Sequence, residues 1–189
     1  MRLKLFLPLL LGLTGCAASI PPVEVTRFHV AGAPVPGPVL IEAAPGISSD
    51  SLEFRTYAAA VQRELIRLGY ATGGRATYRV VIAQSQSSRT RTARSPVSIG
   101  IGGGTAGGGV GIGLGTSFGL GSTSRTLVAT RLAVQIKRVA DGATVWEGRA
   151  ETEAPDRAPA SQPGLAADKL ARALFQGFPG DSGRTIRVP

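Results

Sequence analysis

Cysteine and histidine are nearly absent from this sequence, whose 189 residues include one of each, Cys16 and His29. A single cysteine excludes an intramolecular disulfide, so the folded chain has to be stabilised by a hydrophobic core. A lone histidine without a second imidazole or a second thiol is most often a half-buried strand residue, because zinc sites and catalytic triads need several such groups together. We therefore expect no metal site and no catalytic residues.

Motifs for nucleotides and for serine hydrolases are missing as well. The sequence contains no Gly-Lys-Ser or Gly-Lys-Thr phosphate loop and no Gly-x-Ser-x-Gly elbow. Gly102-x-Gly104-x-x-Gly107 fits the dinucleotide fingerprint by letter, but neither a helix pattern nor a suitably placed acidic residue follows it. We expect no cofactor. A hydrolase that uses a pair of carboxylates remains an alternative.

The first residues are typical of an export signal. Arg2 and Lys4 form a positively charged start, and the apolar run from Leu5 to Leu13 that follows is too short to span a bilayer as a helix. The run closes with Leu13-Thr14-Gly15-Cys16. An ordinary cleaved signal with an incidental cysteine is the alternative interpretation.

Leu13-Thr14-Gly15-Cys16 resembles the lipobox of bacterial lipoproteins. The resemblance implies that Cys16 carries acyl chains such as palmitate and becomes the mature N-terminus. Ala17 stands where an aspartate would imply retention in the inner membrane, so the resemblance favours the periplasmic face of the outer membrane. We expect a signal peptide over residues 1–15 and a lipidated tether over residues 16–22.

Positive charge dominates the composition. The chain has 21 Lys and Arg against 12 Asp and Glu, a net +9, and removal of Arg2 and Lys4 with the signal leaves a net +7. A basic surface is attracted to anionic lipid and to anionic cell-wall polymer. Nucleic acid is not an expected partner of an exported lipoprotein.

Periodicity predicts two helices and several strands. The first helix is expected from Asp50 to Leu68, with Asp50 as its cap and Gly69 as its stop, and the second from Gly164 to Gln176. Strands are expected at Val23–Val30, Val39–Ala43 and Ala76–Gln86, and residues 183–189 are expected to form a frayed tail.

A further hairpin is expected between Leu127 and Thr152. A three-residue loop, Ala140-Asp141-Gly142, places Ile136 opposite Trp146, whereas a two-residue loop would mix core and solvent positions. The longer loop is therefore predicted, with Gly142 at positive φ and Trp146 in the core.

Arginines recur in the polar segment from Ser85 to Ser95. Arg89, Arg91 and Arg94 are spaced so that an extended chain would present at least the first two on one face. One interpretation is a contact for the phosphate or carboxylate groups of an anionic polymer. The alternative is a solvated strand whose charges protect a sheet edge.

A glycine-rich ladder occupies the middle of the chain. Pairing Ile99 with Ile112 would give a hairpin with one apolar face and one bare face, formed by Gly100, Gly102, Gly109, Gly111 and Gly113. A bare face permits close approach of a partner, so we expect a docking face for an envelope protein. The alternative is a mobile low-complexity loop.

The order of short motifs over residues 24–182 resembles the bacterial lipoprotein family called domain of unknown function 4136, DUF4136. The matching pieces are Glu64-Leu65-x-x-Leu68-Gly69-Tyr70, the following strand, the glycine-rich hairpin, Val145-Trp146-x-Gly148 after a Leu132–Ile136 strand, and Leu174-Phe175-x-x-Phe178-Pro179. The resemblance implies an α+β domain, which we place at residues 23–182, and implies no activity.

Together these patterns predict an antiparallel sheet with two helices on one face, preceded by a lipoprotein signal peptide. The expected function is that of a non-catalytic binding or structural module of the cell envelope, anchored to the outer membrane. The alternative is an exported hydrolase acting on an envelope substrate.

Overall fold

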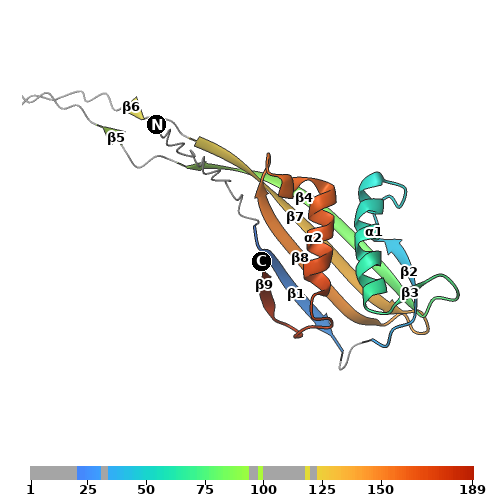
Figure 1. The fold of residues 1–189 in the computed structure, drawn as a ribbon. Coiled ribbons are helices and arrows are strands. Elements are labelled where there is room, and N and C mark those ends of the chain that lie inside the picture. Colours follow the sequence, from blue (N-terminus) through green and yellow to red (C-terminus); the bar gives the residue numbers. More distant parts are fainter. Residues whose placement is uncertain (1–20, 31–33, 94–97, 100–117, 120–122) are drawn as a thin grey trace, which may run out of the picture.

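The structure is a computed structural model that describes residues 21–30, 34–93, 98–99, 118–119 and 123–189. Its main element is a seven-stranded sheet in the order β3-β2-β4-β7-β8-β1-β9. The strands are β1 (Val23–His29), β2 (Pro38–Ala43), β3 (Ala71–Thr72), β4 (Tyr78–Ala93), β7 (Thr123–Arg138), β8 (Thr144–Pro155) and β9 (Thr185–Val188). Two helices, α1 (Leu52–Arg67) and α2 (Pro163–Phe175), lie side by side over one face of this sheet (Figure 1). A short 3₁₀ turn, η1 (Pro159–Ser161), precedes α2.

The α+β class and the placement of both helices on one face are confirmed, but the sheet is mixed and not purely antiparallel. β2 runs parallel to both β3 and β4, while the other pairs in this sheet are antiparallel. The reason lies in the connection, because α1 stands between β2 and β4 and carries the chain back to the end at which β2 began. Parallel neighbours need such a crossover, whereas a hairpin turn joins antiparallel ones.

The cap of the first helix lies one residue later than predicted. Ser51, and not Asp50, is the cap, and its Oγ accepts a hydrogen bond from the Phe54 N–H at 3.1 Å. Both residue types cap helices well, so sequence alone did not separate them. The stop at Gly69 is confirmed by its φ of +89°, a conformation that favours glycine.

The hairpin of β7 and β8 has the predicted strand register. Ile136 pairs with Trp146, and two further cross-strand pairs follow in step along the strands, Val134 with Gly148 and Leu132 with Ala150. Gly142 has a φ of +71°, and the register shifts by one residue just after Ile136. This irregularity lets the consecutive residues Val145 and Trp146 both be buried.

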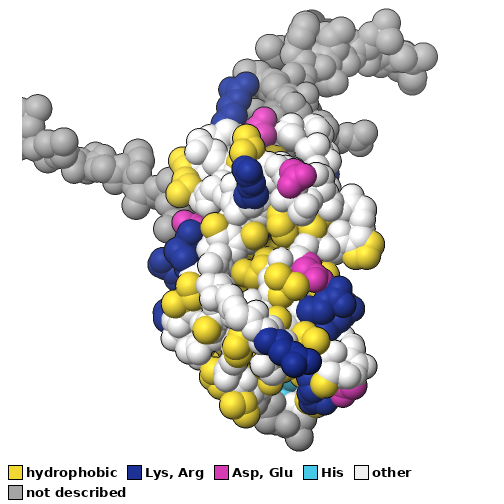
Figure 2. All heavy atoms as spheres, turned by 90° about the vertical axis from the view of Figure 1, so that its right-hand side faces the viewer, with side chains coloured by type: hydrophobic (Ala, Val, Ile, Leu, Met, Phe, Trp, Pro, Cys, Tyr) yellow, Lys and Arg dark blue, Asp and Glu magenta, His cyan; other side chains and the backbone are white. Residues whose placement is uncertain are grey.

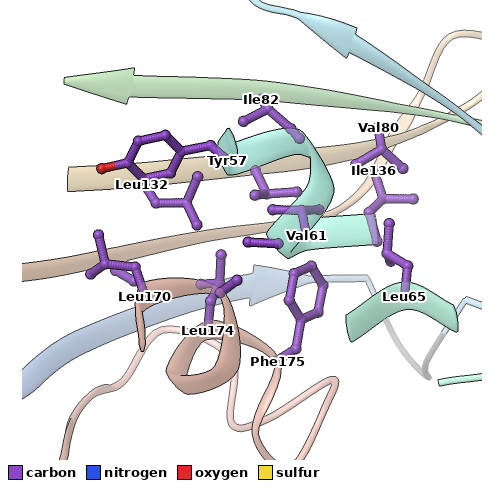
Figure 3. Close-up of a cluster of buried hydrophobic side chains, with 14 of the residues drawn as sticks. Tyr57, Val61, Leu65, Val80, Ile82, Leu132, Ile136, Leu170, Leu174 and Phe175 are labelled. Atoms are coloured by element: carbon purple, nitrogen blue, oxygen red, sulfur yellow. The ribbon is translucent and has the colours of Figure 1, made fainter. Parts of the chain in front are cut away.

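The core lies between the sheet and the two helices. Figure 3 shows Tyr57, Val61 and Leu65 of α1 beside Leu170, Leu174 and Phe175 of α2, with side chains of β4 and β7 against them. Trp146 is fully buried, as predicted. Helix α2 therefore packs on the β7, β8 and β1 part of the sheet, and α1 covers the β4 and β2 part.

Gly148 is required by this packing. A Cβ at this position would lie 2.5 Å from Cη2 of Trp146 and 2.7 Å from Cδ1 of Leu174. Gly148→Ala should therefore lower the free energy of unfolding by about 1–3 kcal/mol, measured by urea denaturation. Gly164→Ala is the matched control, because no atom lies within 4 Å of its added Cβ and alanine favours a helix, so its stability should stay equal or rise. Equal stabilities for both variants would contradict this account of the packing.

Two expectations about the ends of elements are wrong. Residues 183–189 are not a frayed tail, because Thr185–Val188 form β9 and pair with β1. In the glycine-rich region, β5 (Ser98–Ile99) pairs with β6 (Phe118–Gly119), so Ile99 lies opposite Phe118 and not opposite Ile112. Glycine-rich strands specify their register weakly, since few side chains distinguish one pairing from another.

Candidate functional site

The sheet face opposite the helices carries a set of arginine–glutamate pairs. They are Arg79 with Glu42, Arg131 with Glu151, Arg149 with Glu147, Arg187 with Glu24, and Arg89 with Glu153. Strand alternation places these residues on the open face, because their neighbours in sequence, such as Val25, Ala150 and Leu132, are buried under the helices. Surface pairs of this kind add little stability, but the opposite charges within each pair cancel. The part of the open face that these pairs cover therefore has little net charge despite the basic composition of the chain.

Three of these carboxylates line one hollow on the open face. Glu24, Glu151 and Glu153 border a space of about 380 Å³, together with Arg89 and Arg187. Each carboxylate has an arginine partner: the Arg187 to Glu24 separation is 2.9 Å and that of Arg131 to Glu151 is 2.6 Å, while Arg89 pairs with Glu153. All three are thus engaged by guanidinium groups of the same chain.

His29 is half-buried at the end of β1, as expected for a strand residue. Both ring nitrogens lie against backbone carbonyl oxygens, Nδ1 at 2.8 Å from that of Val30 and Nε2 at 2.9 Å from that of Gly180. Within the described ranges, no three His, Cys, Asp or Glu side chains are grouped closely enough to hold a metal ion. The imidazole therefore contributes to the packing of the β1 end against the segment after α2.

The arginines singled out in the sequence lie on the long strand β4. Arg89 pairs with Glu153 of β8, and Arg91 lies directly opposite Arg125 of β7. Arg94 lies outside the described residues. The structure thus ties one of the three arginines to an acidic partner and brings a second one to a position opposite another arginine.

The remaining predicted site residues also fall outside the described part of the chain. These are Leu13, Thr14, Gly15 and Cys16 of the lipobox, and Gly100, Gly102, Gly109, Gly111 and Gly113 of the expected docking face. The described part of the chain begins at Pro21, whose carbonyl oxygen accepts a hydrogen bond from Nζ of Lys169 on α2. Partial burial lowers the pKa of the Lys169 ammonium. Neither described helix is long and apolar enough to cross a membrane.

Two arginines with notable positions in the structure were not identified from the sequence. Arg125 precedes the predicted start of the hairpin at Leu127, because Ser124 and Thr126 beside it give no hydrophobic alternation. Arg27 was not singled out, yet it is the most buried charged residue of the described chain, only 4% exposed. The only sequence signal for Arg27 is its place in β1, which follows the two buried valines and precedes the exposed end of the strand.

The far edge of the sheet offers a weaker candidate. β3 covers only Pro38 and Val39 of β2, so the rest of β2 has no strand on its outer side. Figure 2 looks at this side of the molecule and shows hydrophobic side chains reaching the surface between charged ones. Glu42 on this edge is paired with Arg79, and a charge at a sheet edge usually prevents pairing with another strand.

Comparison with known proteins gives a family match and a partial relative. A family model described as Domain of unknown function (DUF4136) matches residues 40–180. An uncharacterised protein of Zymomonas mobilis is 43% identical over 70 residues, which is 37% of this chain and 26% of that protein. The matched segment therefore spans about a quarter of that relative's length.

Two solved structures are partly similar to this one. A PelC dodecamer from Paraburkholderia phytofirmans gives a TM-score of 0.44 at 12% identity, over 81% of this chain and 94% of that one. A PDZ domain protein from Parabacteroides distasonis gives 0.48 at 10% identity, over 88% of this chain and 39% of that one. TM-scores below 0.5 carry no inference about what this chain binds or does.

Proposed function

The chain belongs to the DUF4136 family, and we propose that it is a lipoprotein anchored through Cys16 to the periplasmic face of the bacterial outer membrane. There it acts as a non-catalytic binding or structural module of the cell envelope. The observation that carries the proposal is the sequence Leu13-Thr14-Gly15-Cys16, placed directly after a short apolar run with a basic start.

The start of the folded domain is compatible with such an anchor. β1 begins at Val23, so only residues 17–22 separate the lipidated cysteine from the sheet. A tether of this length leaves the domain close to the membrane surface and free of the bilayer itself. Two or three acyl chains make such an anchor stable, whereas one chain alone gives only reversible binding.

The acidic side chains in the hollow are already paired within the chain, which supports a binding or structural module over a hydrolase. Glu24, Glu151 and Glu153 share a hollow, as a carboxylate-based hydrolase would require, but each is paired with an arginine. His29, the only imidazole in the sequence, has both ring nitrogens against backbone carbonyls. The exported hydrolase remains the second candidate, because three carboxylates in one hollow are the arrangement on which it would rely.

Cys16→Ala should abolish membrane anchoring. In fractionated cells the variant is expected to leave the outer-membrane fraction, or to remain as an uncleaved precursor in the inner membrane, because no thiol is available for acylation. Ser19→Ala is the matched control, since it lies in the same tether and leaves the lipobox intact, so it should fractionate as the unaltered chain does.

A high-salt wash separates the anchor from electrostatic adhesion. A chain held only by its basic surface would be released, because salt screens surface charges, whereas an acylated chain stays bound. Recovery of Cys16→Ala in the salt-washed outer-membrane fraction, at the level of the Ser19→Ala control, would rule out this anchor.

A further inference from the structure

A basic ribbon projects from one end of the sheet. We use this name for residues 89–93 of β4 and 123–127 of β7, which pair with each other from Arg89 with Leu127 to Ala93 with Thr123. In Figure 1, β4 and β7 continue past the helices and past the start of β1. The ribbon contains three arginines and no acidic residue, and the sequence has no Asp or Glu anywhere from Leu65 to Ala140.

Within the ribbon, two arginines occupy directly opposite positions. The register pairs Arg91 with Arg125, and residues directly opposite in an antiparallel pair lie on the same face. Like charges at such positions destabilise a strand pair unless a counter-charge is near. The ribbon itself contains no acidic residue that could supply this counter-charge.

The acids at the base of the ribbon are fewer than the arginines there. Glu153 is paired with Arg89, which leaves Asp156 as the next acidic residue along the chain. The Asp156 N–H donates to the carbonyl oxygen of Thr126 at 3.1 Å, and the residue after it is Arg157, a further positive charge. The ribbon and its base thus carry an excess of positive charge, in contrast to the paired charges on the rest of the open face.

The N-terminal end of the domain lies at the same place. Pro21 and Pro22 line the hollow to which Arg89 and Glu153 also contribute, so the chain enters β1 beside the base of the ribbon. Six residue steps separate Cys16 from Pro22, and an extended chain spans at most about 3.3–3.6 Å per residue. A lipid-bearing Cys16 would therefore keep this end of the domain within about 20 Å of the membrane surface.

We propose that the ribbon, through Arg91 and Arg125, binds the phosphate groups of anionic phospholipids in the membrane that holds Cys16. The inference rests on the proposed lipid anchor. Arginine binds phosphate strongly because its planar fork can donate two hydrogen bonds at once. The anchor confines the ribbon to the headgroup region, so even weak individual contacts become effectively intramolecular.

Membrane contact also accounts for the position of the basic pair at this end of the sheet. Each basic residue close to an anionic surface contributes attraction that falls off within a Debye length. A basic pair at the far end of the sheet, where Arg75 and Ala140 lie, would be beyond that range. The chain therefore binds the membrane at two points, by its lipid and by the ribbon, and the sheet takes a defined orientation relative to the bilayer.

Site-specific fluorescence in vesicles tests the proposal. The purified lipoprotein has no free thiol once Cys16 is acylated, so a single introduced cysteine can be labelled selectively. Thr90→Cys places a label on the ribbon and Ala140→Cys places one at the β7–β8 turn, both at exposed positions. Fourteen residue steps of strand and turn separate Thr126, the partner of Thr90, from Ala140, a distance of roughly 45 Å.

In vesicles of phosphatidylethanolamine and phosphatidylglycerol that contain a headgroup quencher, the label at position 90 should be quenched and the label at position 140 should not. Replacing phosphatidylglycerol with phosphatidylcholine should reduce the quenching at position 90. Arg91→Ala and Arg125→Ala should each lower the ratio of bound to free ribbon about fivefold, whereas Arg75→Ala, the loss of one charge at the far end, should leave it unchanged.

Two controls keep the outcomes separate. Arg91→Lys with Arg125→Lys retains the charge and should retain most of the quenching, and thermal unfolding of each variant verifies that the domain is folded. If the lipoprotein floats with the vesicles but the label at position 90 is not quenched, the ribbon proposal is wrong and the anchor stands. The same conclusion follows if that label is quenched to the same extent without phosphatidylglycerol or without the two arginines. If the chain does not float with the vesicles at all, the anchor is wrong and the ribbon proposal falls with it.

Discussion

Trp146→Ala should lower the free energy of unfolding by about 3–5 kcal/mol, one of the two largest effects that we expect for a single substitution. The indole is fully buried and stacks on Phe175, with ring centroids 5.4 Å apart and an interplanar angle of 16°. It also contacts Phe178 at a centroid distance of 5.3 Å. Alanine would leave a cavity between β8 and the end of α2, because the surrounding rings relax only in part.

The indole N–H adds a polar contribution that a second variant isolates. Nε1 of Trp146 donates to the carbonyl oxygen of Pro179 at 3.1 Å. Trp146→Phe keeps an aromatic ring but loses this donor, and should cost about 1–3 kcal/mol. Urea denaturation of both variants measures the difference. A melting temperature of Trp146→Ala equal to that of the unaltered chain would mean that the side chain is exposed and available for a ligand.

Arg27→Met is expected to cost a similar amount, about 3–5 kcal/mol. The guanidinium lies under the C-terminal end of α2, where Nε donates to the carbonyl oxygen of Leu174 and Nη2 donates to those of Ala173 and Gln176, each at 2.9 Å. The last carbonyls of a helix have no partner within the helix and carry partial negative charge. Methionine fills part of the space but leaves three carbonyl oxygens without their donor.

Arg187→Met provides the matched control for this prediction. Arg187 lies on β9, the strand next to β1, and its ion pair with Glu24 is largely exposed to solvent. Its loss should change the free energy of unfolding by no more than about 1 kcal/mol. Burial lowers the pKa of Arg27, but an arginine stays charged, so its contribution should not vary across the physiological pH range. Equal denaturation midpoints for the two variants would refute the assigned role of Arg27.

The strongly periodic elements of this fold were predictable from local sequence. Helix α2 begins at Pro163, one residue from the predicted start, and helix α1 ends at Arg67, one residue before the predicted end. The β7–β8 register followed from the demand that Ile136 and Trp146 share a buried face. A helix stripe or a strand alternation is a property of neighbouring residues, so it is visible without knowledge of the partner elements.

The candidate site was predicted only in part, because charge pairing depends on strands that are distant in sequence. Arg89 was recognised as a basic strand residue, but its partner Glu153 lies on β8, which is two strands away in the sheet order. The pairing of Arg91 with Arg125 depends on how far the β4–β7 pair continues, and the strand prediction had stopped at Gln86 and Leu127. Threonine and serine between the arginines gave no hydrophobic alternation with which to extend it.

By itself, the sequence determined the lipobox interpretation, the two amphipathic helices, the buried tryptophan and membership of an α+β class. The tertiary structure alone decided that β2 runs parallel to β4, that the C-terminal residues form β9, and that Arg27 supports the end of α2. The physical reason is the range of the interactions. Side-chain periodicity acts over a few residues, whereas strand pairing and the placement of a buried charge join residues far apart in the sequence, 39 positions between Val39 and Tyr78 and 147 between Arg27 and Leu174.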